Sequence, residues 1–268
     1  MSRKFCKLFL KNAFFNFNAH NVVYKLKNQE DVWMAEMYFN YNKMMSEIDL
    51  YVNKYPFISV IGICDSILGN NIPAIILGEG ETVITYIGGE EGCDSISSFL
   101  LLRFVRDICS LYEERGAAFG FSAENILKNY TLVVIPMLNP DGNIYCSECE
   151  VGALSNFLRY GYTPNILVTL SQGDECDGTV IYGEGEVENK ISVALSQMSG
   201  MKRIYRESKE PRLVLCDWAM QEISSQAFSI ELPQFKYSTR KQYEDKSFSY
   251  YARIRKIFFC TPFLNKIK

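Results

Sequence analysis

Three acidic residues fall within five positions of the segment IGGEEGCDS (residues 87–95): Glu90, Glu91 and Asp94. An apolar, strand-like run (83–87) leads into this segment, and a helix-like run follows it. Carboxylates gathered at a strand-to-helix turn repel one another unless a cation or a substrate lies among them. The turn is therefore a candidate ligand-binding or reactive site.

Other polar segments also follow apolar, strand-like runs. They are PMLNPDG (136–142), SQGD (171–174) and the end of FSIEL (228–232), which contains Glu231. The carboxyl ends of parallel strands meet at one edge of a sheet, and ligand sites form there. We therefore expect these segments and the acidic turn to converge on one crevice.

Strand-like and helix-like runs alternate along the chain. Apolar runs predict strands at 57–64, 73–77, 82–87, 131–136, 165–170, 179–182 and 227–232. Helical spacing predicts helices at about 29–55, 95–115, 123–129, 187–199, 216–225 and 240–259. Several strands are apolar throughout, which is typical of strands buried on both faces. The sequence therefore predicts an α/β fold with a mixed, mostly buried β-sheet sandwiched between helices.

The chain of 268 residues is long enough to bury one large core, so we expect a single domain with terminal additions. Residues 1–54 are interpreted as an N-terminal extension and a helix. Residues 55–232 form the α/β core. Residues 233–268 contain a C-terminal helix that packs on this core.

Composition narrows the functional classes. A net charge of −3 gives no reason to expect a nucleic-acid partner. The nine cysteines lack the regular spacing of a disulfide framework. No signal peptide is recognisable, and no stretch approaches the roughly 20 apolar residues that a membrane span needs. We therefore expect a cytoplasmic protein without a transmembrane segment.

The run PMLNPDG (136–142) resembles the NPDG loop of the zinc carboxypeptidases, the carboxypeptidase A-like metallopeptidases. The bacterial branch that trims peptidoglycan peptides is the most similar. Segments 55–78, LSQGDE (170–175) and CDWAMQEISSQAFSIEL (216–232) resemble family segments in the same order. The resemblance covers about 55–232, and it implies a carboxypeptidase-like sheet between helices.

Family members hold one zinc ion with an H-x-x-E pair at the strand-to-helix turn and one later histidine. The resemblance places these ligands at Glu91, Asp94 and Leu170, and the chain's single histidine, His20, lies far upstream. Leu170 has no lone pair, Asp94 is one methylene shorter than glutamate, and Glu91 replaces an imidazole with a hard carboxylate. We therefore expect a degenerate member without zinc. Glu91→His, Asp94→Glu and Leu170→His together are expected to restore zinc affinity.

The resemblance puts the family's catalytic glutamate, which deprotonates the zinc-bound water, at Glu231. Without the metal, general base catalysis supplies only about 10²–10⁴-fold, so we expect this residue to be idle. In the family an Asn-Arg pair clamps the substrate carboxylate. Asn156 and Arg159 are its closest remnant, but their spacing differs and a surface arginine is the simpler interpretation.

Two other metal sites stay open. A hard cation such as Mg²⁺ or Ca²⁺ could bind among the carboxylates Glu90, Glu91, Asp94, Asp174 and Glu231. A structural zinc site could form from the thiolates of Cys93, Cys146, Cys149 and Cys176. A serine or cysteine nucleophile finds no base near the matched region.

Functions of different classes therefore remain. The chain could be a pseudoenzyme that binds a peptide or a partner protein. Alternatively, it could be a divergent metallocarboxypeptidase, or a γ-D-glutamyl-diaminopimelate-type peptidase that acts on bacterial cell-wall peptides with substitute metal ligands. A decaying gene product without any ligand is the third interpretation. The sequence does not indicate the oligomeric state.

Overall fold

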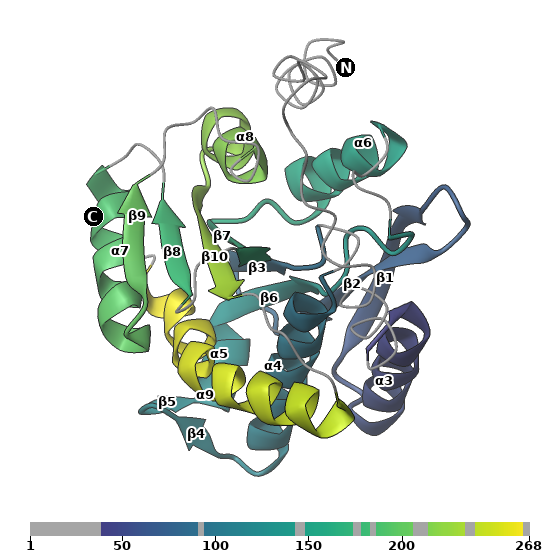
Figure 1. Ribbon diagram of the computed structural model, residues 1–268, viewed down its shortest axis with the longest axis horizontal. Helices are drawn as coiled ribbons and strands as arrows, with labels where there is room; N and C mark the ends of the chain where they lie inside the picture. The colour runs from purple at the N-terminus through teal and green to yellow at the C-terminus, as the bar shows by residue number, and fades with distance from the viewer. Residues whose placement is uncertain are drawn as a thin grey trace.

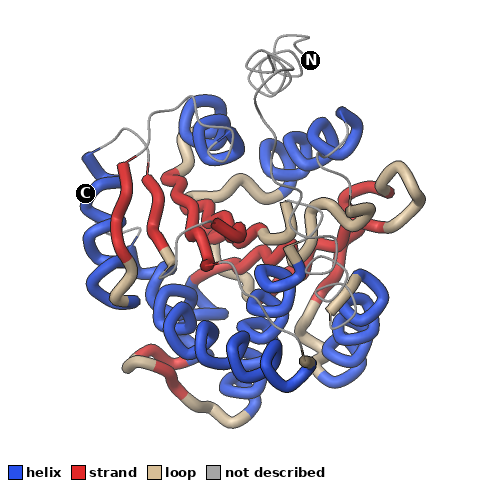
Figure 2. Tube along the Cα trace, viewed as in Figure 1, coloured by secondary structure: helices blue, strands red, loops and turns tan. Residues whose placement is uncertain are grey.

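The computed structural model describes residues 39–90, 94–142, 148–173, 178–182, 186–205, 214–233 and 239–264. These residues form an eight-stranded mixed sheet with helices on both faces (Figures 1 and 2). The predicted α/β sandwich is confirmed. None of the described helices combines the length and the apolar character that crossing a membrane requires.

The sheet has the strand order β1-β2-β6-β3-β7-β10-β8-β9. Its strands are β1 (Ser59–Asp65), β2 (Asn71–Leu77), β3 (Thr82–Ile87), β6 (Tyr130–Ile135), β7 (Ile166–Gly173), β8 (Thr179–Tyr182), β9 (Lys202–Tyr205) and β10 (Gln226–Pro233). The inner strands β6, β3, β7 and β10 run parallel, so their carboxyl ends lie at one edge, called here the carboxyl edge. β6 and β7 lie on opposite sides of β3 in the sheet, so the direction of the chain's connections reverses at β3. Ligands bind at such switch points in open α/β sheets.

Helices cover both faces of the sheet. They are α3 (Tyr41–Lys54), α4 (Ser95–Glu113), α5 (Ala123–Asn129), α6 (Glu148–Asn156), the π-helical turn η1 (Phe157–Gly161), α7 (Glu186–Ser199), α8 (Val214–Ile223) and α9 (Arg240–Leu264). A short hairpin, β4 (Ala117–Ala118) and β5 (Phe121–Ser122), follows α4. Figure 1 shows α6 and α8 on one side of the sheet and the other helices on the opposite side.

Alternate side chains of each strand enter two separate hydrophobic cores. In β6, Leu132 and Val134 pack with α3, α4, α5, α7 and α9 in what we call the major core. Val133 and Ile135 pack with α6 and α8 in the minor core. Successive side chains of a strand point to opposite faces, so the core that a residue joins shows which face it occupies.

Most predicted elements lie where the apolar patterns placed them. β3, α5 and β8 have the predicted bounds, and α4 ends at Glu113. The described part of the first predicted helix is α3, since residues 29–38 lie outside the described residues. The elements that were not predicted are the short hairpin strands β4 and β5, the helix α6, which contains Gly152, the turn η1 that follows it, and β9, a short strand with a charged residue at its start.

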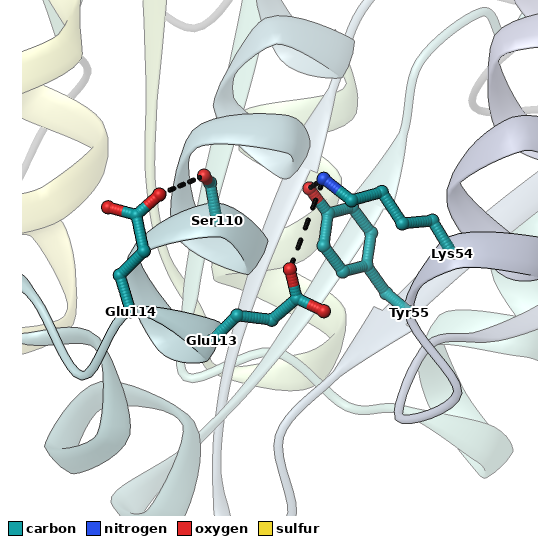
Figure 3. Close-up of polar contacts among 5 residues, drawn as sticks. All are labelled: Lys54, Tyr55, Ser110, Glu113 and Glu114. Carbon is teal, nitrogen blue, oxygen red and sulfur yellow. Dashed lines mark hydrogen bonds and ion pairs between the residues drawn. The ribbon is translucent and has the colours of Figure 1, made fainter.

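The contact between the ends of α3 and α4 is polar (Figure 3). Lys54 Nζ donates a hydrogen bond of 2.9 Å to Tyr55 Oη and lies 3.9 Å from Glu113 Oε2. The hydrogen bond with Tyr55 is the main reason why the pKa of Lys54 is raised. Nearby, Ser110 Oγ donates to Glu114 Oε1 at 3.0 Å. Exposed ion pairs contribute little to stability, so apolar packing in the major core holds α3 in place.

The C-terminal helix α9 packs across α4 and reaches the middle of the sheet. Tyr86 Oη of β3 donates to the carbonyl oxygen of Phe258 at 2.9 Å, and both side chains are buried. Tyr251 Oη donates to Asp107 Oδ2 of α4, also at 2.9 Å. α9 therefore packs against both α4 and β3, and it closes the major core over these two elements.

Candidate functional site

The acidic turn after β3 and the NPDG loop after β6 lie together, as predicted. The amide of Leu138 donates to the Gly88 carbonyl at 3.0 Å, and the amide of Asn139 donates to the Gly89 carbonyl at 2.8 Å. Gly89 has a φ of +62°, and a Cβ there would lie 2.8 Å from Met137 Cα. Only glycine allows this close approach of the two loops.

Asp94 ends the turn as the N-cap of α4. Its Oδ1 accepts a 3.0 Å hydrogen bond from the Ser97 amide, and its Oδ2 accepts a 2.5 Å hydrogen bond from Ser97 Oγ. The side chain is buried, with 2% exposed. Both oxygens are thus engaged at the start of a helix, where a carboxylate also interacts favourably with the helix dipole. Asp94, and not the following Ser95, is therefore the N-cap of α4.

Leu170 and Glu231 face opposite sides of the sheet. Leu170 packs in the major core with Ile230 and Leu232, its neighbours on β10. Glu231 lies between Ile230 and Leu232 in the strand, so its side chain faces the minor core. Glu231 is buried (1% exposed) and Leu170 is fully buried. An imidazole at position 170 would therefore enter the apolar core instead of reaching Glu231.

The residue of β7 that shares a face with Glu231 is Ser171. Glu231 pairs in register with Ser171 of β7 and, on its other side, with Thr179 of β8. All three side chains are buried, with 5%, 1% and 0% exposed for Ser171, Glu231 and Thr179. We call these three residues the polar row. Thr169 and Ser229, also buried, continue the polar surface one step toward the middle of the sheet.

The sequence contains a signal for this arrangement that the motif comparison did not use. In β7 the apolar residues Ile166, Val168 and Leu170 alternate with Thr169 and Ser171. A period of two predicts that Leu170 and Ser171 occupy different faces. In β8, Thr179 alternates with Val180 in the same way. The sequence analysis did not identify Thr179 as a candidate site residue.

The start of α8 covers the polar surface beside the polar row. Cys216 Sγ and Thr169 Oγ1 share a hydrogen bond of 3.7 Å. Burial raises the pKa of the Cys216 thiol, the hydrogen bond with Thr169 offsets part of this rise, and the charges of Glu90 and Asp217 add to it. Glu90 and Asp217 therefore lie close enough to Cys216 to act on it, and the thiol stays neutral.

Asp141 of the NPDG loop has a structural partner, the loop between β1 and β2. Its Oδ1 accepts hydrogen bonds from Ser66 Oγ (2.5 Å) and Asn70 Nδ2 (2.9 Å), and its Oδ2 accepts one from the Leu68 amide at 2.9 Å. Burial alone would raise the pKa of Asp141, but these hydrogen bonds and one from the Ile67 amide outweigh it and lower the pKa. Asp141 of the NPDG loop thus holds the loop between β1 and β2 beside the candidate site.

Arg159 and Asn156 lie away from the polar row. Asn156 is the last residue of α6, and Arg159 Nη2 lies 3.1 Å from Glu222 Oε2 in the last turn of α8. The amino ends of β7 and β10 are adjacent there, because the amide of Gln226 donates to the carbonyl of Asn165. Glu231 lies five residues further along β10, about 16 Å away at 3.3 Å per residue. The structure therefore does not bring Arg159 together with Glu231.

Several candidate ligands lie outside the described residues. These are Glu91, Cys93, Cys146, Asp174 and Cys176, and the side chain of Cys149 is also not described. His20 is likewise outside. Within the described ranges, no three His, Cys, Asp or Glu side chains are arranged to hold a metal ion.

The zinc set implied by the resemblance does not fit the described residues. A catalytic zinc needs three donors around one point. Leu170 offers no donor and faces the opposite side of the sheet from Glu231. Asp94 uses both carboxylate oxygens to cap α4. No step through a zinc ion follows from this arrangement.

Comparison with known proteins identifies relatives. A family model described as zinc carboxypeptidase matches residues 44–173. A curated protein, gamma-D-glutamyl-L-diamino acid endopeptidase 1 of Lysinibacillus sphaericus, is 29% identical over 104 residues, which make up 39% of this chain and 26% of that protein. The matched segment therefore spans about a quarter of the length of this relative.

Solved structures share the fold. A metallo-carboxypeptidase from Burkholderia cenocepacia has a TM-score of 0.63 at 14% identity, covering 80% of this chain and 68% of the other. Bovine thrombin-activatable fibrinolysis inhibitor has a TM-score of 0.61 at 16% identity, covering 84% of this chain and 97% of the other. At such identities the likeness shows the fold alone. The chain is thus similar in sequence to the zinc carboxypeptidase family model over residues 44–173, and similar in fold to these structures.

Proposed function

We propose that this chain is a carboxypeptidase-like protein without zinc-dependent peptidase activity, and that it binds a peptide or a partner protein at the carboxyl edge. The observation that carries this proposal is the orientation of Leu170, which faces the major core while Glu231 faces the minor core. The capping role of Asp94 supports it, because a second position of the implied zinc set then serves the fold.

The chemistry explains why the loss matters. Zinc lowers the pKa of a bound water from 15.7 to about 7 and so creates the nucleophile for amide hydrolysis. The resemblance puts the family's base at Glu231, but a base without an acidified water supplies about 10²–10⁴-fold at most. The buried polar surface around Glu231 suits recognition of a polar ligand better than hydrolysis.

A second candidate function is a peptidase that acts on γ-D-glutamyl peptides of a diamino acid with substitute metal ligands. The name of the Lysinibacillus sphaericus relative favours this activity. Glu231 at the carboxyl edge is also consistent with it. Substitute ligands would have to come from residues outside the described ranges. Glu91, Cys93 and Asp174 are candidates, because they directly follow in sequence the described segments 88–90 and 171–173 of the carboxyl edge.

One experiment separates the two candidates. The full chain, purified without a polyhistidine tag, is analysed for bound metals and assayed for cleavage of γ-D-glutamyl-diaminopimelate peptides with and without a chelator. We expect far less than one metal per chain and no cleavage. One tightly bound metal per chain together with chelator-sensitive cleavage would replace our proposal with the second candidate.

We also propose a reducing, cytoplasmic setting in a bacterial cell, and a single domain in which the N-terminal extension and the C-terminal helix accompany the core. The described cysteines Cys109, Cys216 and Cys260 form no disulfide with another described cysteine, which supports the setting. Mass spectrometry of the alkylated protein from cell extracts would test it, because disulfide-bonded cysteines would escape alkylation.

A further inference from the structure

We propose that the polar row of Ser171, Glu231 and Thr179 binds a primary ammonium group. This inference rests on the proposed metal-free function, because a metal beside Glu231 would compete for the same carboxylate. It names the chemical class of the ligand at that site. Four observations carry it: the register, the hydroxyl groups without partners, the charge of the edge and the number of acceptors.

The register places two hydroxyl groups on either side of one carboxylate. Glu231 is the residue directly paired with Ser171 on β7 and with Thr179 on β8. Paired side chains on one face have Cβ atoms about 5 Å apart. All three point to the minor-core face, since Leu170, Ile230 and Val180 beside them pack in the major core.

The second observation concerns the hydroxyl groups of Ser171 and Thr179. Among the described residues, neither Ser171 Oγ nor Thr179 Oγ1 has an acceptor or a donor within reach, and both atoms are buried. Buried polar atoms in folded proteins are nearly always paired, so each exception calls for an explanation. A ligand that donates hydrogen bonds at this place would pair both groups at once.

The charge of the carboxyl edge selects a cation. The described residues at this edge are 88–90, 94–98, 136–142, 171–173, 178–179, 202, 214–217 and 231–233, and their one cation is Lys202, which is exposed and pairs in register with Thr179. The same segments contain the carboxylates of Glu90, Asp94, Asp141, Asp217 and Glu231. An anionic edge attracts a positively charged group and repels a substrate carboxylate.

The number of acceptors distinguishes an ammonium from other cations. A primary ammonium has three N–H donors, and the polar row offers a carboxylate and two hydroxyl oxygens. A guanidinium carries five N–H donors, more than the four side-chain oxygen atoms of the polar row can pair one to one. Among the described residues, no group of His, Cys, Asp and Glu side chains is arranged for a metal ion.

The test is calorimetric titration of the full chain with Nα-acetyl-L-lysine amide, which carries one ammonium group on its side chain. We expect saturable binding of one ligand per chain and no binding of the analogue acetylated at Nε. Alanine amide carries its ammonium at the α position, so it shows whether a peptide N-terminus can serve instead of a side chain. Binding of either amine supports the proposal and identifies the source.

Three variants of the polar row test the contacts. Thr179→Val and Ser171→Ala should each weaken amine binding by about tenfold, the effect of one lost hydrogen bond to a charged group. Glu231→Gln keeps the shape but removes the charge, and it should abolish binding. Without ligand, Thr179→Val should raise Tm by about 2–4 °C, because it removes a buried hydroxyl group without a partner.

Thr85→Val is the matched control. Among the described residues, Thr85 Oγ1 is likewise buried without a partner, and Thr85 faces the minor core because its neighbours Ile84 and Tyr86 pack in the major core. It pairs with Leu167, four residues before Ser171, so it lies away from the polar row. This variant should raise Tm like Thr179→Val and leave amine binding unchanged.

The outcomes are separable. If no amine binds, and Thr179→Val and Thr85→Val merely change Tm alike, the row holds a bridging water only and the inference fails. Amine binding that Thr179→Val leaves intact would also overturn it. Metal analysis of the same sample keeps the two proposals apart: a tightly bound metal contradicts the proposed function, whereas a metal-free protein that ignores amines contradicts this inference alone.

Discussion

Leu170 and Glu231 lie on adjacent parallel strands, one register step apart, and their side chains point to opposite faces of the sheet. A zinc site that used both positions would need both side chains on one side. The pleat of the two strands forbids this without a shift of register, because a shift by one residue exchanges the faces of every side chain. Position 171 therefore belongs to the same face as Glu231.

Leu170→His should damage the core without creating a metal ligand. Replacing a fully buried leucine with a polar ring in the major core should lower the free energy of unfolding by about 2–4 kcal/mol. Leu170→Met keeps the volume and should cost less than about 1.5 kcal/mol. Denaturant unfolding measures both, and titration with zinc should show no gain. A Leu170→His protein as stable as the wild type would contradict the orientation described here.

Asp94 should behave as a helix cap. Asp94→Ala removes both acceptors of Ser97, so the free energy of unfolding should fall by about 1–2 kcal/mol. Asp94→Asn keeps a side-chain acceptor and should lose less. Ser122, the N-cap of α5, makes one exposed hydrogen bond of 3.4 Å, and Ser122→Ala is a control with a smaller expected loss. Equal stability of Asp94→Ala and the wild type would exclude the capping role.

Asp141 should make stability depend on pH under acidic conditions. Its pKa is lowered in the folded protein, so its contribution is fully present above the ordinary aspartate value of about 3.9. That contribution is lost as the pH falls through the lower pKa of the folded state. Ser66→Ala removes one hydrogen bond to the carboxylate and should move this loss to a higher pH. Unfolding free energies measured between about pH 5 and pH 2 would show the shift, and identical profiles for both proteins would argue against it.

Cys216 should resist alkylation in the folded protein. Burial raises the pKa of its thiol, and only the thiolate reacts rapidly. Cys64 is half-buried and serves as the internal comparison. Treatment with iodoacetamide at about pH 8, followed by mass spectrometry, should label Cys64 faster than Cys216 until the protein is unfolded. Equal labelling in the native state would show that the cover of the polar surface by α8 opens readily.

The sequence predicts the sheet well because its strands are long apolar runs with turn residues between them. β3 and β8 have their predicted bounds, and the acidic turn meets the NPDG loop because both follow parallel strands. α6 escaped prediction because Gly152 lowers its helix propensity and its apolar face is short. β9 is a short edge strand of mixed composition.

The site was harder to predict than the fold. Motif comparison aligns Leu170 with a ligand by its neighbours in LSQG, but it does not consider the pleat. The alternation of Thr169 and Ser171 with apolar residues places polar groups on one face of β7, and Glu231 does the same on β10. Hydroxyl groups without partners depend on packing and rotamers, and no pattern of residue types reveals them.

Arg159 should matter for the contact between η1 and α8 and not for the ligand. Its guanidinium pairs with Glu222 at 3.1 Å and lies over the Trp218 ring, near the amino ends of β7 and β10. Both partners are partly exposed, so Arg159→Gln should lower the free energy of unfolding by less than about 1 kcal/mol. Glu222→Gln, which breaks the same pair from α8, should cost a similar amount. Neither variant should alter the affinity for Nα-acetyl-L-lysine amide, because Glu231 lies at the opposite end of β10. Loss of amine binding in Arg159→Gln alone would place this arginine beside the ligand, and the ligand would then span the whole face from η1 to the carboxyl edge.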